Sequence, residues 1–205
     1  KLYTIYHGID VSKIISSNDA KLKEVIENSK GIILGNAGRL TNQKGQKYLI
    51  EIAKKLKNKN LEFTLFIAGT GDMESKLKQL IIENGLNEEI IMLGFIDNMN
   101  AFMNSIDVFL LTSEWEGFGF VLVEAMARKV PVVCFDISSN PEIIKDKETG
   151  FLAPFPDTSK FANHVLTLAN DSSLIQEMGE ASKKHVFNNF IIEDRIKELN
   201  DVIIN

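Results

Sequence analysis

Short, continuously apolar runs alternate with amphipathic runs along most of this chain. The apolar runs predict strands at residues 1–6, 31–37, 61–68, 90–93, 107–111, 131–135 and 150–153. The amphipathic runs predict helices at residues 19–29, 46–56, 72–84, 99–105, 120–127, 158–168, 172–187 and 192–204, with one helical turn at 141–144. Strands without a polar face are typical of a parallel sheet that is covered on both sides.

This alternation predicts an α/β fold, a Rossmann-like doubly wound parallel sheet, and no repeat or flexible linker divides the chain into two domains. In such sheets ligands bind beyond the carboxyl ends of the strands. Five segments with chemically useful residues follow predicted strands. They are Arg39 and residues 69–71, 94–95, 113–119 and 136–142. We therefore expect them to share one crevice.

Composition narrows the class of protein. The chain has 205 residues, of which 44% are hydrophobic, enough to bury a large core. A net charge of -5 argues against a broad nucleic-acid interface. Cys134 is the sole cysteine, so no internal disulfide can form and a reducing compartment is expected. The chain starts at Lys1 rather than Met, and we expect a fragment cut at a domain boundary.

Residues 113–128 carry the clearest candidate chemistry. They predict a turn between a buried strand and a helix, and Gly117 and Gly119 would let backbone N–H groups approach an anion closely. Glu124 lies among apolar neighbours, where a carboxylate is costly unless something donates hydrogen bonds to it. Ligand hydroxyls are one candidate donor. Glu116 lies at the mouth of the same turn.

Two cations follow the strand at residues 31–37. Arg39 and Lys44 are interpreted as phosphate contacts, with solvated surface charges as the alternative. Gly69 and Gly71 match a dinucleotide-binding fingerprint only in part, and the chain contains no Walker loop. With one cysteine and no H-E-x-x-H motif, a metal site has little support. His164 and His185 are interpreted as surface or core residues rather than ligands.

Residues 116–124, Glu-Gly-Phe-Gly-Phe-Val-Leu-Val-Glu, resemble the paired glutamates of retaining glycosyltransferases of family four, which have the two-lobed GT-B architecture. Residues 38–40 with Lys44 and Gly45 resemble that family's G-R-L…K-G. Further motifs follow in the family's order at residues 67–71, 93–95, 107–113, 131–133, 142–144 and 150–152, and residues 7–10 resemble the N-G-[IV]-D that opens its second lobe.

The resemblance implies a place for the chain within such an enzyme. Residues 1–205 would be one domain, the C-terminal lobe that binds the nucleotide sugar. The N-terminal acceptor lobe would be missing, and the helix at residues 190–204 would cross back to it. The fragment alone is therefore expected to bind nucleotide but to be inactive.

The resemblance also implies roles for individual residues. Arg39 and Lys44 would hold the donor diphosphate and stabilise its developing charge, Glu116 would contact a hydroxyl of the transferred sugar, and Glu124 would accept from the ribose hydroxyls. Arg39, Lys44 and Glu116 are the expected catalytic residues. The expected donor-binding residues are Gly38, Gly69, Gly94, Phe95, Ile96, Gly117, Phe118, Gly119, Phe120, Val121 and Glu124.

The implied reaction is transfer of a hexosyl group, with retention, from a nucleotide-diphosphate sugar to a glycan or lipid-linked acceptor in bacterial polysaccharide biosynthesis. UDP is preferred over GDP, and neither a metal nor a further cofactor is expected. The expected location is cytoplasmic, at the inner face of the membrane, with peripheral attachment through the missing lobe. Ser138 and Ser139 stand where the family often has glycines, which leaves the sugar open.

Other classes of protein are the alternatives. A sugar-nucleotide epimerase or a phosphorylase would share the GT-B fold and would be separated by product analysis. A non-catalytic module is a further alternative, and it predicts that nucleotide diphosphates leave thermal stability unchanged.

Overall fold

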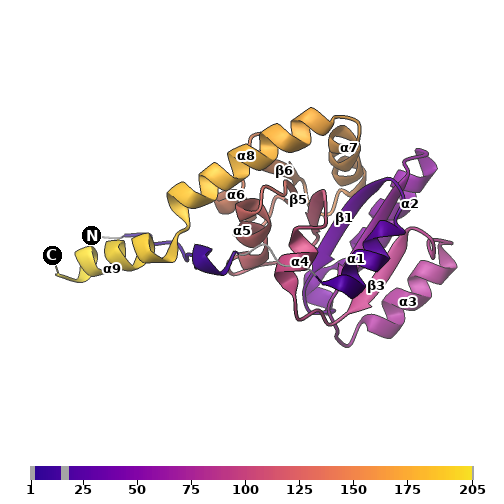
Figure 1. Cartoon of the computed structure of the whole chain (residues 1–205), viewed down its shortest axis with the longest axis horizontal. Helices are drawn as coiled ribbons and strands as arrows, with labels where there is room; N and C mark the ends of the chain where they lie inside the picture. Colours follow the sequence, from indigo (N-terminus) through magenta and orange to yellow (C-terminus); the bar gives the residue numbers. More distant parts are fainter. Residues whose placement is uncertain (1–2, 15–18, 205) are drawn as a thin grey trace.

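The computed structural model describes residues 3–14 and 19–204. They form a sheet of six parallel strands in the order β3-β2-β1-β4-β5-β6, so the strand order reverses direction between β1 and β4 (Figure 1). This confirms the doubly wound α/β fold. The strands are β1 (Ile32–Ala37), β2 (Phe63–Ala68), β3 (Ile90–Gly94), β4 (Val108–Leu111), β5 (Val132–Phe135) and β6 (Gly150–Ala153).

Helices connect the strands and end the chain. They are α1 (Ala20–Glu27), α2 (Gln46–Asn58), α3 (Glu74–Glu83), α4 (Met99–Met103), α5 (Phe120–Ala127), α6 (Asn140–Ile143), α7 (Thr158–Ala169), α8 (Ser172–Asn189) and α9 (Ile192–Ile204), with 3₁₀ turns η1 (Val11–Lys13) and η2 (Asn42–Lys44). Their bounds lie within a few residues of those that the apolar pattern predicts.

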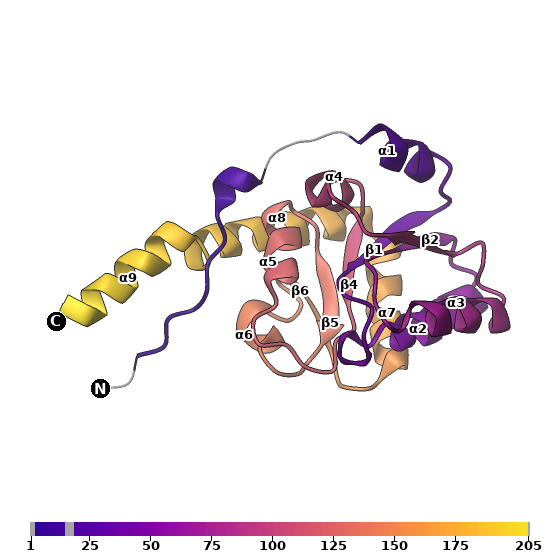
Figure 2. The ribbon, with the colours of Figure 1, turned by 90° about the horizontal axis from the view of Figure 1, so that it is seen from below.

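Each face of the sheet has its own hydrophobic core. Along β2, Leu65 and Ile67 pack with α2, α3 and α7, whereas Phe66 and Ala68 pack with α4 and α5 on the opposite face. Figure 2 shows α1 and α4 on one side of the sheet and α2, α3 and α7 on the other. Since alternate residues are buried on opposite faces, all six positions of β2 are buried, which explains its continuous apolar run.

The strand predicted at residues 1–6 is wrong where the structure describes it. Residues 3–8 have no regular secondary structure, and the segment pairs through a single parallel bridge between Ile9 and Ile191. Ile9 N–H donates to the Phe190 carbonyl at 2.8 Å. The two edges of the sheet are β3 and β6, and the segment pairs with neither. It runs beside the junction of α8 and α9. Residues 1 and 2 lie outside the described residues.

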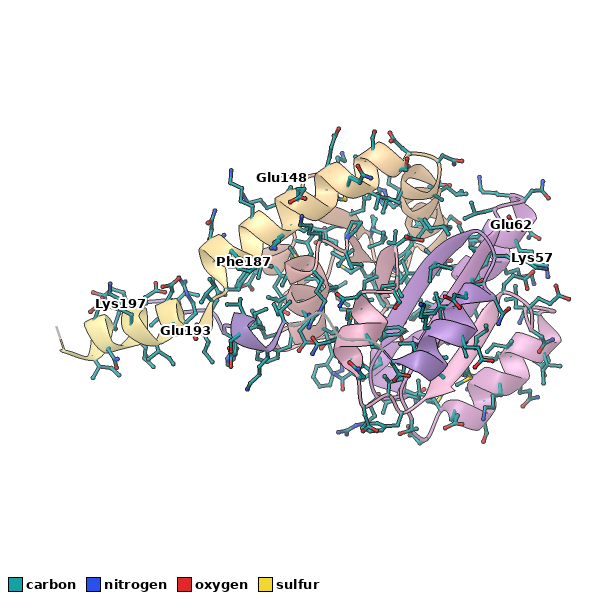
Figure 3. The ribbon with its side chains drawn as sticks, in the orientation of Figure 1. Lys57, Glu62, Glu148, Phe187, Glu193 and Lys197 are labelled. Carbon is teal, nitrogen blue, oxygen red and sulfur yellow. The ribbon has the colours of Figure 1, made fainter. Side chains whose placement is uncertain are left out.

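Helix α9 projects from the body of the domain (Figure 1). Figure 3 shows Glu193 and Lys197 on this helix, beyond Phe187 at the end of α8. The helix expected at residues 190–204 begins at Ile192. Phe190 precedes it and is buried against Tyr6 of the N-terminal segment. Its contact with another lobe stays a prediction.

Candidate functional site

Glycines bring the carboxyl ends of the first three strands close together. Gly69 has φ 135°, and a Cβ there would lie 1.9 Å from the Gly38 carbonyl oxygen, a distance that no side chain can adopt. The Gly69 N–H donates to the Gly94 carbonyl at 2.7 Å. Residues after β1, β2 and β3 therefore meet at one point, and they belong to three of the five segments that were expected to share a crevice.

A cavity of about 270 Å³ opens at this point. The side chain of Arg39 is exposed there and forms no ion pair with a carboxylate of the described residues. Phe95 is 73% exposed at the wall, which is unusual for a large aromatic ring. The lining residues are Gly38, Arg39, Ala68, Gly69, Thr70, Phe95, Ile96 and Met99. A free cation beside an exposed ring suits an anionic aromatic ligand.

Lys44 is placed beside the cavity by the glycine that follows it. Gly45 adopts the left-handed conformation at φ 62°, and a Cβ there would lie 2.1 Å from the Thr112 carbonyl oxygen. The turn can therefore pack directly against the end of β4. The Lys44 stem runs 3.9 Å from where a Cβ on Gly38 would lie, alongside the cavity wall.

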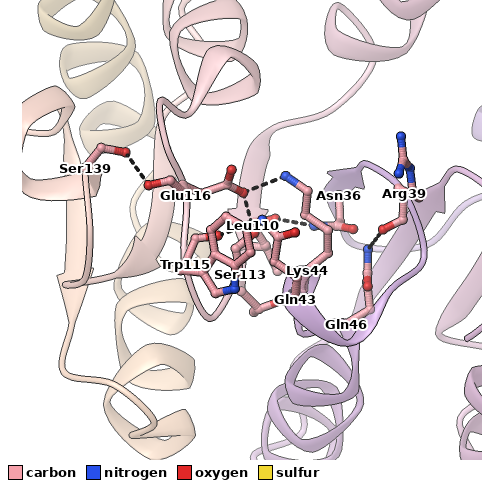
Figure 4. Close-up of polar contacts among 11 residues, drawn as sticks. Asn36, Arg39, Gln43, Lys44, Gln46, Leu110, Ser113, Trp115, Glu116 and Ser139 are labelled. Carbon is pink, nitrogen blue, oxygen red and sulfur yellow. Dashed lines mark hydrogen bonds and ion pairs between the residues drawn. The ribbon is translucent and has the colours of Figure 1, made fainter.

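Glu116 accepts two hydrogen bonds from side chains of the protein. Lys44 Nζ lies 2.7 Å from Glu116 Oε1, and Ser113 Oγ donates to the same oxygen at 2.5 Å. The Glu116 side chain is only 7% exposed, so these bonds offset the desolvation of its charge. Figure 4 shows the Lys44 ammonium directed at Glu116, with the Arg39 side chain lying apart from the pair.

The glycine bend after Glu116 is supported by aromatic packing. The His7 ring lies 5.3 Å from the Phe118 ring and 5.5 Å from the Phe120 ring. Apart from its two chain neighbours, no described residue has an atom within 4 Å of a Cβ built on Gly117, so the space over this residue is open. The N-terminal segment thus packs against the bend through His7, a contact that the sequence did not indicate.

Glu124 on α5 is half-buried. No hydrogen bond reaches its carboxylate from any described residue, and burial raises the pKa of this group, partly offset by the Arg128 guanidinium. Arg128 donates to the Glu124 carbonyl oxygen at 2.7 Å and to the Asn100 side chain. Asn100 belongs to α4, whose Met99 lines the cavity, so these contacts connect α5 to the helix at the cavity wall.

The structure brings together some of the predicted site residues. Five of them line the cavity, namely Gly38, Arg39, Gly69, Phe95 and Ile96. Lys44 and Glu116 form an ion pair next to it. Residues 117–121 and Glu124 belong to the adjoining bend and helix and do not line the cavity itself.

Sequence reasoning assigned no role to Ser113 or Met99. The spacing of Ser113 three residues before Glu116 was an available signal, because short polar side chains often bond groups two to four residues away. No local pattern indicated Met99.

His164 and His185 are packed into the fold. The His164 ring stacks on Phe151 at 4.6 Å, and His185 Nε2 lies 3.1 Å from the Ile143 carbonyl oxygen. Among residues 3–14 and 19–204, no cluster of histidine, cysteine and acidic side chains has a geometry that could hold a metal ion. None of the helices described is both long and apolar enough to traverse a bilayer.

The strand order and the cavity beyond the ends of β1, β2 and β3 define the class: a doubly wound domain with a cavity at the carboxyl ends of its strands, where such sheets bind ligands. The sequence model described as "Glycosyl transferases group 1" matches residues 17–185. The chain belongs to this family, and its six-stranded sheet has the Rossmann-like fold found in GT-B glycosyltransferases.

A named relative is also a glycosyltransferase. The chain is 28% identical over 211 residues to the Escherichia coli UDP-Gal:alpha-D-GlcNAc-diphosphoundecaprenol alpha-1,3-galactosyltransferase, covering 100% of this chain and 54% of the relative. It therefore spans about half of that enzyme's length.

Two solved structures are similar. Staphylococcus aureus TarM in complex with Fondaparinux, alpha-GlcNAc-glycerol and UDP has 25% identity and a TM-score of 0.80, over 83% of this chain and 35% of TarM. Anabaena Alr3699/HepE in complex with UDP has 24% identity and a TM-score of 0.88, over 97% of this chain and 56% of that protein. The HepE likeness shows the fold alone.

Proposed function

We propose that this chain is the donor-binding lobe of a retaining glycosyltransferase that transfers a hexosyl group from a UDP-sugar to a glycan or lipid-linked acceptor. The observation that carries the proposal is the placement of Arg39 on the wall of one cavity with the Lys44–Glu116 pair beside it. The presence of UDP in the TarM structure supports the choice of nucleotide.

The two cations would act on the leaving group. As the bond between sugar and diphosphate breaks, negative charge collects on the diphosphate, and fixed cations at that position lower the barrier. Arg39 is available for this role because it has no anionic partner among the described residues. Lys44 would divide its three donors between Glu116 and a phosphate oxygen. With two cations in this role, we propose that the transfer needs no metal ion.

The remaining contacts would recognise the nucleoside and the sugar. The exposed Phe95 ring offers a surface against which a base can stack, and the Glu124 carboxylate, which accepts no hydrogen bond from the described residues, is available to the ribose hydroxyls. The open backbone at Gly117 leaves space for the sugar. Glu116 would accept from a sugar hydroxyl. No nucleophile is assigned, in keeping with front-side attack.

The acceptor would bind outside the described chain. We propose that a second lobe provides the acceptor-binding site and that α9 packs against that lobe. The same lobe would attach the enzyme to the cytoplasmic face of a membrane. The 205-residue chain would then bind nucleotide without transferring sugar.

A melting assay tests the donor site. A nucleotide that binds only the folded state raises the melting temperature by mass action, and the rise grows with affinity. UDP should therefore raise the melting temperature of the chain more than GDP does. Arg39→Ala should weaken UDP binding by about tenfold or more, the usual effect of losing one charge-assisted contact. Lys78→Ala, a change in an exposed ion pair with Glu74, is the control.

EDTA tests the independence from metal. Its addition should leave the UDP-dependent rise in melting temperature unchanged. Absence of any rise with UDP or GDP would refute the donor site, and loss of the rise only with EDTA would refute metal independence.

A further inference from the structure

Both side chains that donate to the Glu116 carboxylate use the same oxygen. Ser113 Oγ and Lys44 Nζ converge on Oε1 at 2.5 Å and 2.7 Å. In the part of the chain that the structure describes, Oε2 receives no side-chain donor, yet it is not one of the buried unpaired atoms, so it keeps contact with solvent. One oxygen of the carboxylate is anchored and the other is free to accept.

Ser113 is the more rigid of the two anchors. It lies two residues after the end of β4, it is fully buried, and its hydroxyl group turns about a single side-chain bond. Lys44 is 25% exposed and has a long flexible stem. Rotation of the carboxylate would break both bonds in a site that is almost closed to water.

We propose that Ser113 is a positioning residue that orients Glu116, so that Oε2 is the atom that reads a hydroxyl of the transferred sugar. This role rests on the proposed function, because it requires a nucleotide sugar in the cavity. Ser113 itself is 0% exposed and does not line the cavity, so it acts on the donor only through Glu116.

Donor binding increases the importance of Ser113. A diphosphate beside Lys44 competes with Glu116 for the ammonium group, since both are anionic and both lie within reach of the same stem. When Lys44 turns toward the phosphate, the Ser113 hydroxyl is the side-chain donor that still holds Oε1. The carboxylate thus keeps its orientation while the lysine is shared.

Ser113→Ala tests the inference through a ratio of affinities. Calorimetry with the whole chain would give Kd for UDP, UDP-glucose, UDP-galactose, UDP-N-acetylglucosamine, GDP and GDP-mannose. The variant should bind the free diphosphate as the unchanged chain does, and its Kd for the best nucleotide sugar should rise about tenfold, the typical effect of losing a hydrogen bond to a charged group.

Ser182→Ala is the matched control. Ser182 is also fully buried, and its hydroxyl donates to the Thr149 carbonyl at 2.6 Å, away from the cavity. Both variants should lose thermal stability, but only Ser113→Ala should change the ratio of the two dissociation constants. In a Glu116→Ala background, Ser113→Ala should have no further effect on that ratio.

Three results would overturn the role of Ser113: equal weakening of diphosphate and nucleotide sugar, the same ratio change in Ser182→Ala, or an effect that persists without Glu116. If the unchanged chain binds none of the probes, the proposed function fails and the positioning role with it. If it binds free diphosphates and nucleotide sugars and Ser113→Ala leaves the ratio of their dissociation constants unchanged, only the positioning role fails.

Discussion

Glu124 shows how a single residue reflects a conflict between stability and binding. Its carboxylate is half-buried without a hydrogen bond from any described side chain, and desolvation raises its pKa above the ordinary 4.5. The folded state therefore binds this proton more readily than the unfolded chain does. As pH rises from 4.5 through the raised pKa, the unfolded chain loses this proton first. The free energy of unfolding therefore falls over this range. A residue that destabilises the free protein is typical of a binding site.

Glu124→Gln should separate the two effects. At pH 7 the variant should melt at a higher temperature than the unchanged chain, because it has no charge to desolvate, and this difference should vanish below pH 4.5. Its affinity for UDP should fall about tenfold through loss of charge-assisted bonds to the ribose. Thermal melts across pH and calorimetry with UDP would measure these changes.

Glu177→Gln, at an exposed site on α8, is the control for this substitution. Lower stability of Glu124→Gln at pH 7, together with normal UDP affinity, would contradict both parts of the prediction.

At the scale of elements, close approaches of backbone to backbone shape the site. Gly69 after β2 lies against Gly38 after β1, and Gly45 before α2 lies against the end of β4. The first contact closes one wall of the cavity, and the second directs Lys44 toward Glu116. At Gly69 and Gly45 a Cβ would overlap a backbone carbonyl oxygen, so these two glycines determine where the strand ends meet.

Gly69→Ala should therefore destabilise the domain strongly, by roughly 3 kcal/mol or more, because the new Cβ meets the Gly38 carbonyl at 1.9 Å and the backbone conformation is strained as well. Gly85→Ala is the matched control. It has φ 61° with nothing within 4 Å of the Cβ, so it should lose only the roughly 1–2 kcal/mol of a left-handed residue.

Urea unfolding with linear extrapolation would measure both losses. Similar values for Gly69→Ala and Gly85→Ala would show that the backbone conformation, and not the close approach of the strand ends, requires glycine at position 69.

Most elements could be predicted because their signals are local. The six strands from β1 to β6 are short apolar runs bounded by turns, and helix α2 has a regular apolar stripe. The strand predicted at residues 1–6 was wrong over residues 3–6, which the structure describes, because the same apolar run is compatible with a segment that pairs with no sheet edge. Strand formation depends on an available partner, which a local pattern cannot show.

At the scale of the whole molecule, helix α9 stands out because it projects from the domain. It leaves the body of the domain beyond α8 and carries exposed apolar residues at spacings of four, three and four (Figure 1). They are Ile192, Ile196, Leu199 and Ile203. This spacing places them on one side of the helix, and such a stripe favours burial against another surface.

With no other lobe to cover this stripe, we expect the isolated chain to self-associate through it. Replacing Ile196 and Leu199 together by lysine should reduce that self-association, because charge on the stripe opposes its burial. Sedimentation velocity over a range of concentrations would measure the change. The control replaces Glu193 and Lys197, exposed charged residues of the same helix, by glutamine. Equal association of both variants, or no association of the unchanged chain, would contradict the prediction.

The sequence by itself determined the alternation of strands and helices, the burial of both sheet faces and the motifs that identify the family, because each depends on neighbouring residues. Only the tertiary structure decided which side chains meet. The bond between Lys44 and Glu116 joins residues 72 positions apart, and the cavity wall combines residues that follow three different strands. These contacts depend on the order of strands in the sheet and on close backbone approach, which no local pattern records.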